Sequence, residues 1–400
     1  MLLDKYLAYW PVFAGAILFL ALGLWWRLTA ARAMELSPKP LNWVHNYRSG
    51  GYPFRKEVLG RPKLRWWALL LVLVSACVLA AVRLANSGMI VNQTPEWFYS
   101  SRYGILYVLL LSIGAGSVYL ILNILFDSPW AALPGALLFA ASPVRGHGDC
   151  CLLALALLLL LLYLRAEKPG FPAELLYLAS CLALAPLLAL RPALLWLLLC
   201  WPLLHWYKLN RQRREQRLSG GLLLGTLAAS LASWALTVLL TAALHRWLLM
   251  GFRTSALTSL FSAERLRYAL RGLALNCKRH LFTTPTRGML VELLLDAPLL
   301  GFGFWGCFSA WRLGKKRRDV RGVFSIAVLA VLFLVWLLTG RYLLTLGLTL
   351  TAACILRDAN LGKKRWICVL MAAAGVCWYI LIQIAAWYIP LTAGLCERLV

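Results

Sequence analysis

The chain consists of a succession of apolar blocks, separated by short segments that carry most of its charged residues. Each block is about 15–25 residues long, close to the length of helix that crosses the hydrocarbon core of a bilayer. Apolar residues make up 62% of the 400 residues and charged residues only 14%, a balance that excludes an ordinary soluble domain. Within lipid, a helix satisfies its own backbone hydrogen bonds. We therefore predict an all-α, polytopic integral membrane protein.

The apolar blocks predict about twelve transmembrane spans, several of them short. An even number of spans places both termini on the same side of the membrane. The predicted spans are 9–28, 67–84, 105–126, 130–142, 150–165, 175–190, 193–207, 220–244, 289–311, 323–340, 343–356 and 366–389.

The distribution of Lys and Arg between the two sets of loops predicts the orientation. One set carries 26 basic residues and the other 15, of which 8 lie in the long loop 245–288. Basic residues in short loops favour the cytoplasm, whereas long loops have little influence. We therefore expect a multi-pass protein of a bacterial plasma membrane, with both termini outside. The net charge of +26 then indicates contact with anionic membrane lipids and not with nucleic acid.

Three regions follow from this topology. Residues 1–66 form an extra N-terminal span and a basic cytoplasmic linker, 67–356 form a transmembrane core, and 357–400 form a last span with a short external tail. Within the external loop 245–288, "SAERLRYALRGLALN" places leucines on one helical stripe and arginines elsewhere. This pattern predicts an amphipathic helix that lies in the membrane interface.

Few acidic residues lie on the predicted outer side. Glu96 stands among aromatic residues, with Arg102 six positions later; it is either an interfacial surface residue or a general base. Asp149 follows Arg145 and His147 at the mouth of the fifth span. It is a helix cap, part of a polar site, or both.

Further charged residues accompany the predicted spans. Glu292 and Asp296 are four residues apart on the ninth span, and acidic groups there are functional candidates. Arg191 and Arg341 each interrupt two apolar runs, where an arginine either snorkels to the interface or binds phosphate. No metal is required, although Glu96 and Asp149 could hold a divalent cation through their oxygens.

Three segments, in this order, carry a resemblance to a known family. They are "ALLFAASPVRGHGDCCLLALALLLLLLYL", "LASCLALAPLLALRPALLWLLLCWPLL" and "TGRYLLTLGLTL". Together with the topology, they resemble the GT-C glycosyltransferases of the protein mannosyltransferase and aminoarabinose transferase type, over roughly residues 67–356. These are polytopic enzymes that use sugars linked to polyprenyl phosphate.

The resemblance implies roles for individual residues. Glu96 matches the catalytic acid of the first external loop, and Asp149 matches the second acidic position. Arg341 and Tyr342 match the element that holds the lipid phosphate, and Arg191 stands where the family often has Lys before Pro. The implied function is transfer of a sugar from a polyprenyl-phosphate donor to an acceptor outside the cytoplasm.

The sequence also departs from the family pattern. The first loop has Glu instead of Asp with no second acid beside it, and the proline after "RYLL" is missing. Two alternatives therefore stay open: a catalytically degenerate membrane scaffold or accessory protein, and a lipid or solute transporter. A transporter would carry polar residues near the middle of its spans.

Overall fold

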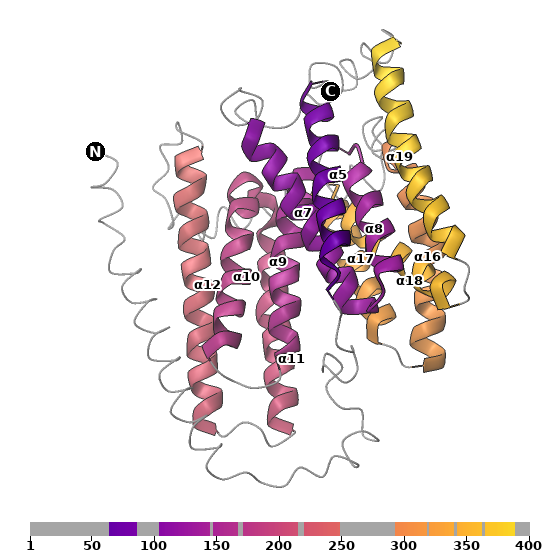
Figure 1. Ribbon diagram of the computed structural model, residues 1–400. Coiled ribbons are helices and arrows are strands. Elements are labelled where there is room, and N and C mark those ends of the chain that lie inside the picture. Colours follow the sequence, from indigo (N-terminus) through magenta and orange to yellow (C-terminus); the bar gives the residue numbers. More distant parts are fainter. Residues whose placement is uncertain are drawn as a thin grey trace. The chain divides into compact units, whose positions relative to one another are not determined.

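The computed structural model describes residues 64–85, 104–144, 147–166, 171–214, 220–248, 293–317, 320–339, 342–361 and 365–388. Within these ranges every regular element is a helix, as predicted (Figure 1). The first predicted span, 9–28, and the external loop 245–288 lie outside the described residues. The elements are α5 (Trp66–Ala85), α7 (Gly104–Phe126), α8 (Pro129–Ala141), α9 (His147–Arg165), α10 (Phe171–Leu190), η2 (Pro192–Leu199), α11 (Cys200–Arg214), α12 (Gly220–Leu248), α16 (Ala297–Arg317), α17 (Val320–Thr339), α18 (Leu344–Leu361) and α19 (Arg365–Tyr388).

Four of these helices are long and apolar enough to cross a membrane, judged by length and composition. They are Ile105–Phe126, His147–Arg165, Pro172–Leu190 and Leu224–Leu244. Shorter apolar helices are Trp66–Val82, Pro129–Ala141, Arg321–Trp336, Leu344–Arg357 and Trp366–Ile382. The chain therefore carries several helices suited to membrane insertion.

The chain divides into two compact units. Unit 1 comprises Met1–Val58 and Ala156–Ser262, and unit 2 comprises Leu59–Leu155 and Ala263–Val400. Helix α9 contributes its first part to unit 2 and its second part to unit 1. Residues of the predicted region 67–356 thus occur in both units.

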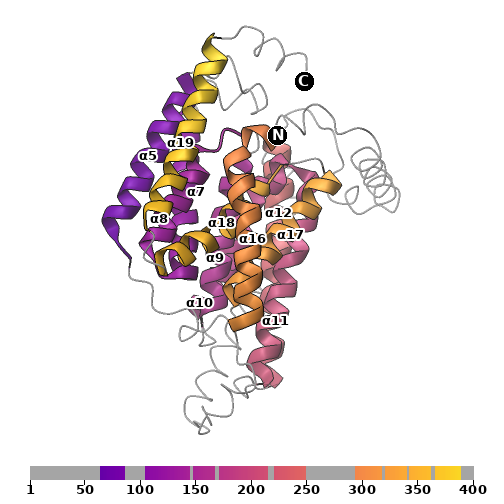
Figure 2. The same cartoon turned by 90° about the vertical axis from the view of Figure 1, so that its right-hand side faces the viewer.

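Helix α18 lies at the centre of unit 2 and packs against α7, α8, α16, α17 and α19. Figure 2 shows α16, α17 and α18 side by side. Every residue from Tyr342 to Leu356 is buried. Because other helices surround it, α18 can be short and can carry threonines, whose hydroxyls bond to carbonyls of their own helix. Thr349 donates to Thr345 O over 2.7 Å, and Thr351 to Leu348 O over 3.0 Å.

Glycines permit the close approach of α16 to α18. A β-carbon placed on Gly306 would collide with the backbone carbonyl of Thr351, and one on Gly303 would lie 2.6 Å from Leu348 Cδ2. Small residues let two backbones approach closely, which is a common basis of helix association in membranes. The pairing of α16 with α18 therefore depends on the absence of side chains at these two positions.

Unit 1 contains the second part of α9 together with α10, η2, α11 and α12. Its largest packing interface joins α10 to α12. The seventh span was predicted as one segment, 193–207, but the structure divides it into the 3-10 helix η2 and the α-helix α11. Proline explains part of this division, because Pro192 opens η2 and Pro202, near the start of α11, has no N–H to donate to residue 198.

Candidate functional site

Asp296 is a buried carboxylate at the beginning of α16. It lies in the turn that precedes the helix, and its backbone carbonyl accepts a hydrogen bond from the N–H of Leu300 over 2.8 Å. Its side chain is only 1% exposed. Residues 293–295 before it are helical too, so Asp296 lies at a one-residue turn between this short stretch and α16.

Three hydroxyl groups donate hydrogen bonds to this carboxylate. Ser142 donates to Oδ1 over 2.8 Å, while Tyr342 and Thr345 both donate to Oδ2 over 2.9 Å. Burial disfavours the ionised form of a carboxyl group, whereas donors to its oxygens favour it. The three hydroxyls therefore supply the polar partners that water would otherwise provide.

Each donor comes from a helix end. Ser142 directly follows α8, Tyr342 lies just before α18, and Thr345 lies in the first turn of α18. Because α8, α16 and α18 each reach this point at one end, the bonds to Asp296 tie three helix termini together. Tyr342 is also packed edge-on against the Trp336 ring at 5.8 Å between centroids.

Helix α9 brings two more predicted residues to the same unit. It begins at His147, whose ring is 1% exposed and lies 4.7 Å from the ring of Phe139. Asp149 is in the first turn, three residues after the N-cap position 146, and a negative charge there is stabilised by the helix dipole. Cys150, the next residue in the chain, lies close to both Asp296 and the backbone of Leu346, so the first turn of α9 is beside the Asp296 carboxylate.

Asp149, Asp296 and Tyr342 therefore belong to one neighbourhood, which we call the helix-end cluster together with Ser142 and Thr345. Sequence reasoning selected three of its members. The two hydroxyl partners were missed, although Ser142 in "ASPVRG" and Thr345 in "RYLLT" both stand beside selected residues.

The other predicted site residues are not in this cluster. Arg191 is in unit 1, between α10 and η2, and its N–H donates to Leu187 O over 2.9 Å. The rest lie outside the described residues: Glu96, Arg102, Arg145, Glu292 and Arg341. No group of three His, Cys, Asp or Glu side chains suited to a metal ion occurs in the described ranges.

Unit 1 contains a second polar group, which sequence reasoning missed. The side chains of Tyr163, Tyr177, His205 and Lys208 are all almost fully buried, and we call them the buried aromatic cluster. His205 Nδ1 lies 2.6 Å from the hydroxyl of Tyr163, and the His205 ring lies 4.5 Å from that of Tyr177. Ser230 of α12 donates to the Tyr177 hydroxyl over 3.2 Å.

Lys208 completes this cluster from α11. Its Nζ donates to the backbone carbonyl of Tyr163 and lies 3.7 Å from the centre of the Tyr163 ring. Tyr163 is in the last turn of α9, where a cation compensates the helix dipole. Lys208 was not among the predicted site residues because it lies one residue after the predicted span 193–207. The available signal was the spacing of Trp201, His205 and Lys208, which share a helical face.

Comparison with protein-family models, with curated proteins and with solved structures finds no match. What the helix-end cluster can do therefore has to follow from the chemistry of its own residues. A carboxylate held by three hydroxyls can fix the ends of α8 and α18 in one arrangement, and Asp149 adds a second acidic group on α9. Such an arrangement can orient a substrate-binding segment.

Proposed function

We propose that the chain is a membrane glycosyltransferase that moves a sugar from a polyprenyl-phosphate donor to an acceptor outside the cytoplasm. The observation that carries the proposal is the helix-end cluster. In it, Asp149 and Tyr342 share a neighbourhood although they are almost 200 residues apart. The resemblance assigns these residues to the acidic side and to the lipid-phosphate side of one site, so their proximity supports that assignment.

In this proposal the acceptor hydroxyl oxygen attacks the anomeric carbon of the sugar. Glu96 takes the proton of the hydroxyl as the general base. The bond between the anomeric carbon and the phosphate oxygen breaks, and the polyprenyl phosphate leaves with the electron pair. Arg341, assisted by Arg191 or by Arg102 and Arg145, stabilises the charge on the departing phosphate.

The proposal includes the predicted topology of twelve spans, with both termini and the 245–288 amphipathic helix on the outer side of a bacterial plasma membrane. In this orientation, the helix ends that carry Ser142, Asp149, Asp296 and Tyr342 face outward. This is the side on which an extracytoplasmic acceptor would arrive.

The test is sugar transfer in membranes that contain the full chain. Short-chain polyprenyl phosphates, each carrying one radiolabelled hexose or amino-pentose, serve as donors. Glu96→Gln and Arg341→Ala should each lower transfer at least 100-fold, the range expected for a lost base or a lost charge stabiliser. Glu397→Gln, which changes a carboxylate close to the C-terminus, is the matched control. Full activity in both site variants would contradict the proposal.

One observation favours a second candidate, the lipid or solute transporter. Lys208 and His205 are buried ionisable residues inside a helical unit, and such residues often mark substrate or ion pathways. Proteoliposomes that move a fluorescent phospholipid between leaflets, but transfer no sugar, would support this candidate. In that case Lys208→Met should slow the movement, and Glu96→Gln should not.

A further inference from the structure

Helix α16 has two different faces. One face carries Gly303 and Gly306 and packs against α18. The opposite face carries an exposed stripe with helical spacing, made of Phe304 (66% exposed), Trp305 (58%), Phe308 (60%), Trp311 (64%) and the exposed Arg312. Exposed apolar surface of this extent on one face indicates a contact with something apolar.

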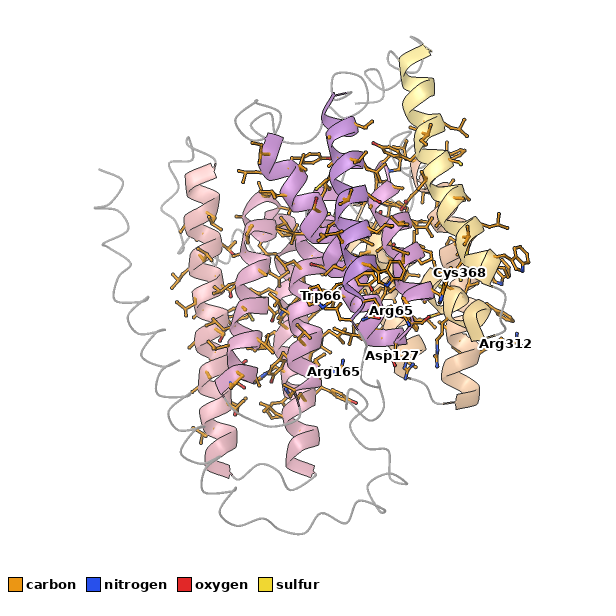
Figure 3. All side chains as sticks on the ribbon, viewed as in Figure 1. Arg65, Trp66, Asp127, Arg165, Arg312 and Cys368 are labelled. Atoms are coloured by element: carbon orange, nitrogen blue, oxygen red, sulfur yellow. The ribbon has the colours of Figure 1, made fainter. Side chains whose placement is uncertain are left out.

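The stripe ends in a cation. The guanidinium carbon of Arg312 lies 5.5 Å from the centre of the Phe308 ring, a cation–π geometry. Figure 3 shows Arg312 beside the lower part of α16. The sequence continues with further basic residues, Lys315, Lys316, Arg317 and Arg318. Positive charge is therefore concentrated at one end of the aromatic stripe.

The length of the stripe matches one leaflet of a bilayer. Eight residues separate Phe304 from Arg312, which corresponds to about 12 Å along a helix. Half of the hydrocarbon core is about 15 Å thick. A lipid whose phosphate lies at Arg312 would therefore extend one acyl chain along the aromatic side chains as far as Phe304.

We infer that this face of α16 is a binding site for one anionic phospholipid. The phosphate pairs with Arg312, and an acyl chain lies along Trp311, Phe308 and Phe304. Trp and Arg at the end of the stripe match the interfacial level of a membrane, where amphipathic rings and basic side chains concentrate. The site faces away from α18, and the inference does not depend on the proposed glycosyltransferase function.

The positive charge at Arg312, together with the aromatic stripe, favours an anionic phospholipid over a neutral phospholipid or a free phosphate ion. A neutral phospholipid would fill the aromatic stripe but would bring a cationic head group towards Arg312 and the basic residues after it. A free phosphate ion would pair with Arg312 but would leave the exposed rings uncovered. An anionic phospholipid would pair its phosphate with Arg312 and would also cover the exposed rings with an acyl chain.

The experiment uses local photo-crosslinking on the full chain in detergent. Phe304→p-benzoylphenylalanine places the photoreactive group at the acyl-chain end of the stripe. The protein is titrated with phosphatidylglycerol or with phosphatidylcholine, and lipid adducts are measured by mass spectrometry. We expect half-maximal crosslinking at a lower concentration of phosphatidylglycerol. Arg312→Gln should weaken that binding about fivefold, the contribution of one interfacial arginine, with a smaller effect on phosphatidylcholine binding, because its choline group offsets the phosphate charge.

Two controls complete the design. Arg65→Gln removes another exposed arginine, beside the exposed Trp66 on α5 (Figure 3), and should leave the crosslinking at position 304 unchanged. Glycerol phosphate should not displace phosphatidylglycerol. Equal crosslinking by the two lipids, no crosslinking, displacement by glycerol phosphate, or no effect of Arg312→Gln would each overturn the inference.

Discussion

Tyr342 donates its phenolic hydroxyl to Asp296 Oδ2 over 2.9 Å, although 46 residues separate the two positions. The bond connects the segment before α18 to the turn before α16. Arg341, the proposed phosphate-binding arginine, is the residue next to Tyr342 in the sequence. One hydrogen bond thus links the stability of unit 2 to the proposed chemistry.

Removing the carboxylate of Asp296, the acceptor that three hydroxyls share, should lower the stability of the protein. We expect Asp296→Ala to lower the free energy of unfolding by about 3 kcal/mol, because three buried hydroxyls lose their acceptor at once. Tyr342→Phe removes a single donor and should cost about 1–2 kcal/mol. Denaturant titration of the purified chain in detergent micelles measures both values. A smaller loss for Asp296→Ala than for Tyr342→Phe would show that the carboxylate does not organise the cluster.

The contact of α16 with α18 predicts opposite effects for two glycines on one helix. Gly306→Ala should destabilise the chain by at least about 2 kcal/mol, because the new β-carbon collides with the Thr351 carbonyl and the backbones must separate. At Gly301, where nothing lies within 4 Å of an added β-carbon, alanine should be neutral or stabilising by up to about 1 kcal/mol. Thermal unfolding of the two variants, measured side by side, tests this difference; equal shifts would argue against the close packing.

Lys208 should stabilise unit 1 through its ammonium group. Lys208→Met keeps most of the side-chain volume but removes the donor to the Tyr163 carbonyl and the cation above the Tyr163 ring. We expect a loss of about 2 kcal/mol, the sum of a charge-assisted hydrogen bond and a desolvated cation–π contact, less the cost of burying the charge. Leu203→Ala on the same helix, where the leucine is 67% exposed, is the control and should change stability by less than about 0.5 kcal/mol. A stabilised Lys208→Met variant would mean that burying the charge outweighs its contacts.

The orientation of the chain is testable by fusion. The excess of Lys and Arg in one set of short loops predicts that the C-terminus is outside the cytoplasm. Alkaline phosphatase fused after Val400 should therefore be active, and the same enzyme inserted within 211–217 should be inactive. The reverse pattern would invert the topology and would place the helix-end cluster on the cytoplasmic side.

Helical structure and suitability for a membrane followed from block length and apolar content, because a segment in lipid must satisfy its own backbone groups. Described helices lie at or near eleven of the predicted spans. The block 343–356 is short for a span that faces lipid, and the structure shows why it can be short: α18 is enclosed by other helices. The division of 193–207 into two helices was missed because hydrophobicity does not distinguish a 3-10 helix from an α-helix.

The candidate residues show the same limit. Asp149 and Asp296 could be selected singly, because a charged residue beside an apolar block is costly and stands out, whereas Tyr342 was selected through the resemblance. Ser142, Thr345 and Tyr163 could not, since hydroxyl side chains occur throughout such sequences. The burial of Lys208 could not be predicted either, because the residue directly follows the predicted span 193–207 and begins a run of basic residues.

The sequence by itself determined that this protein is built from apolar helices, because the number of consecutive apolar residues is a local property of the chain. Only the tertiary structure decided that Asp296 receives hydroxyls from α8 and α18, that Lys208 lies over Tyr163, and that one face of α16 is aromatic while the other admits α18. Each of these depends on which helix faces meet. In apolar sequences nearly every face is hydrophobic, so close packing and a few buried hydrogen bonds select the pairing.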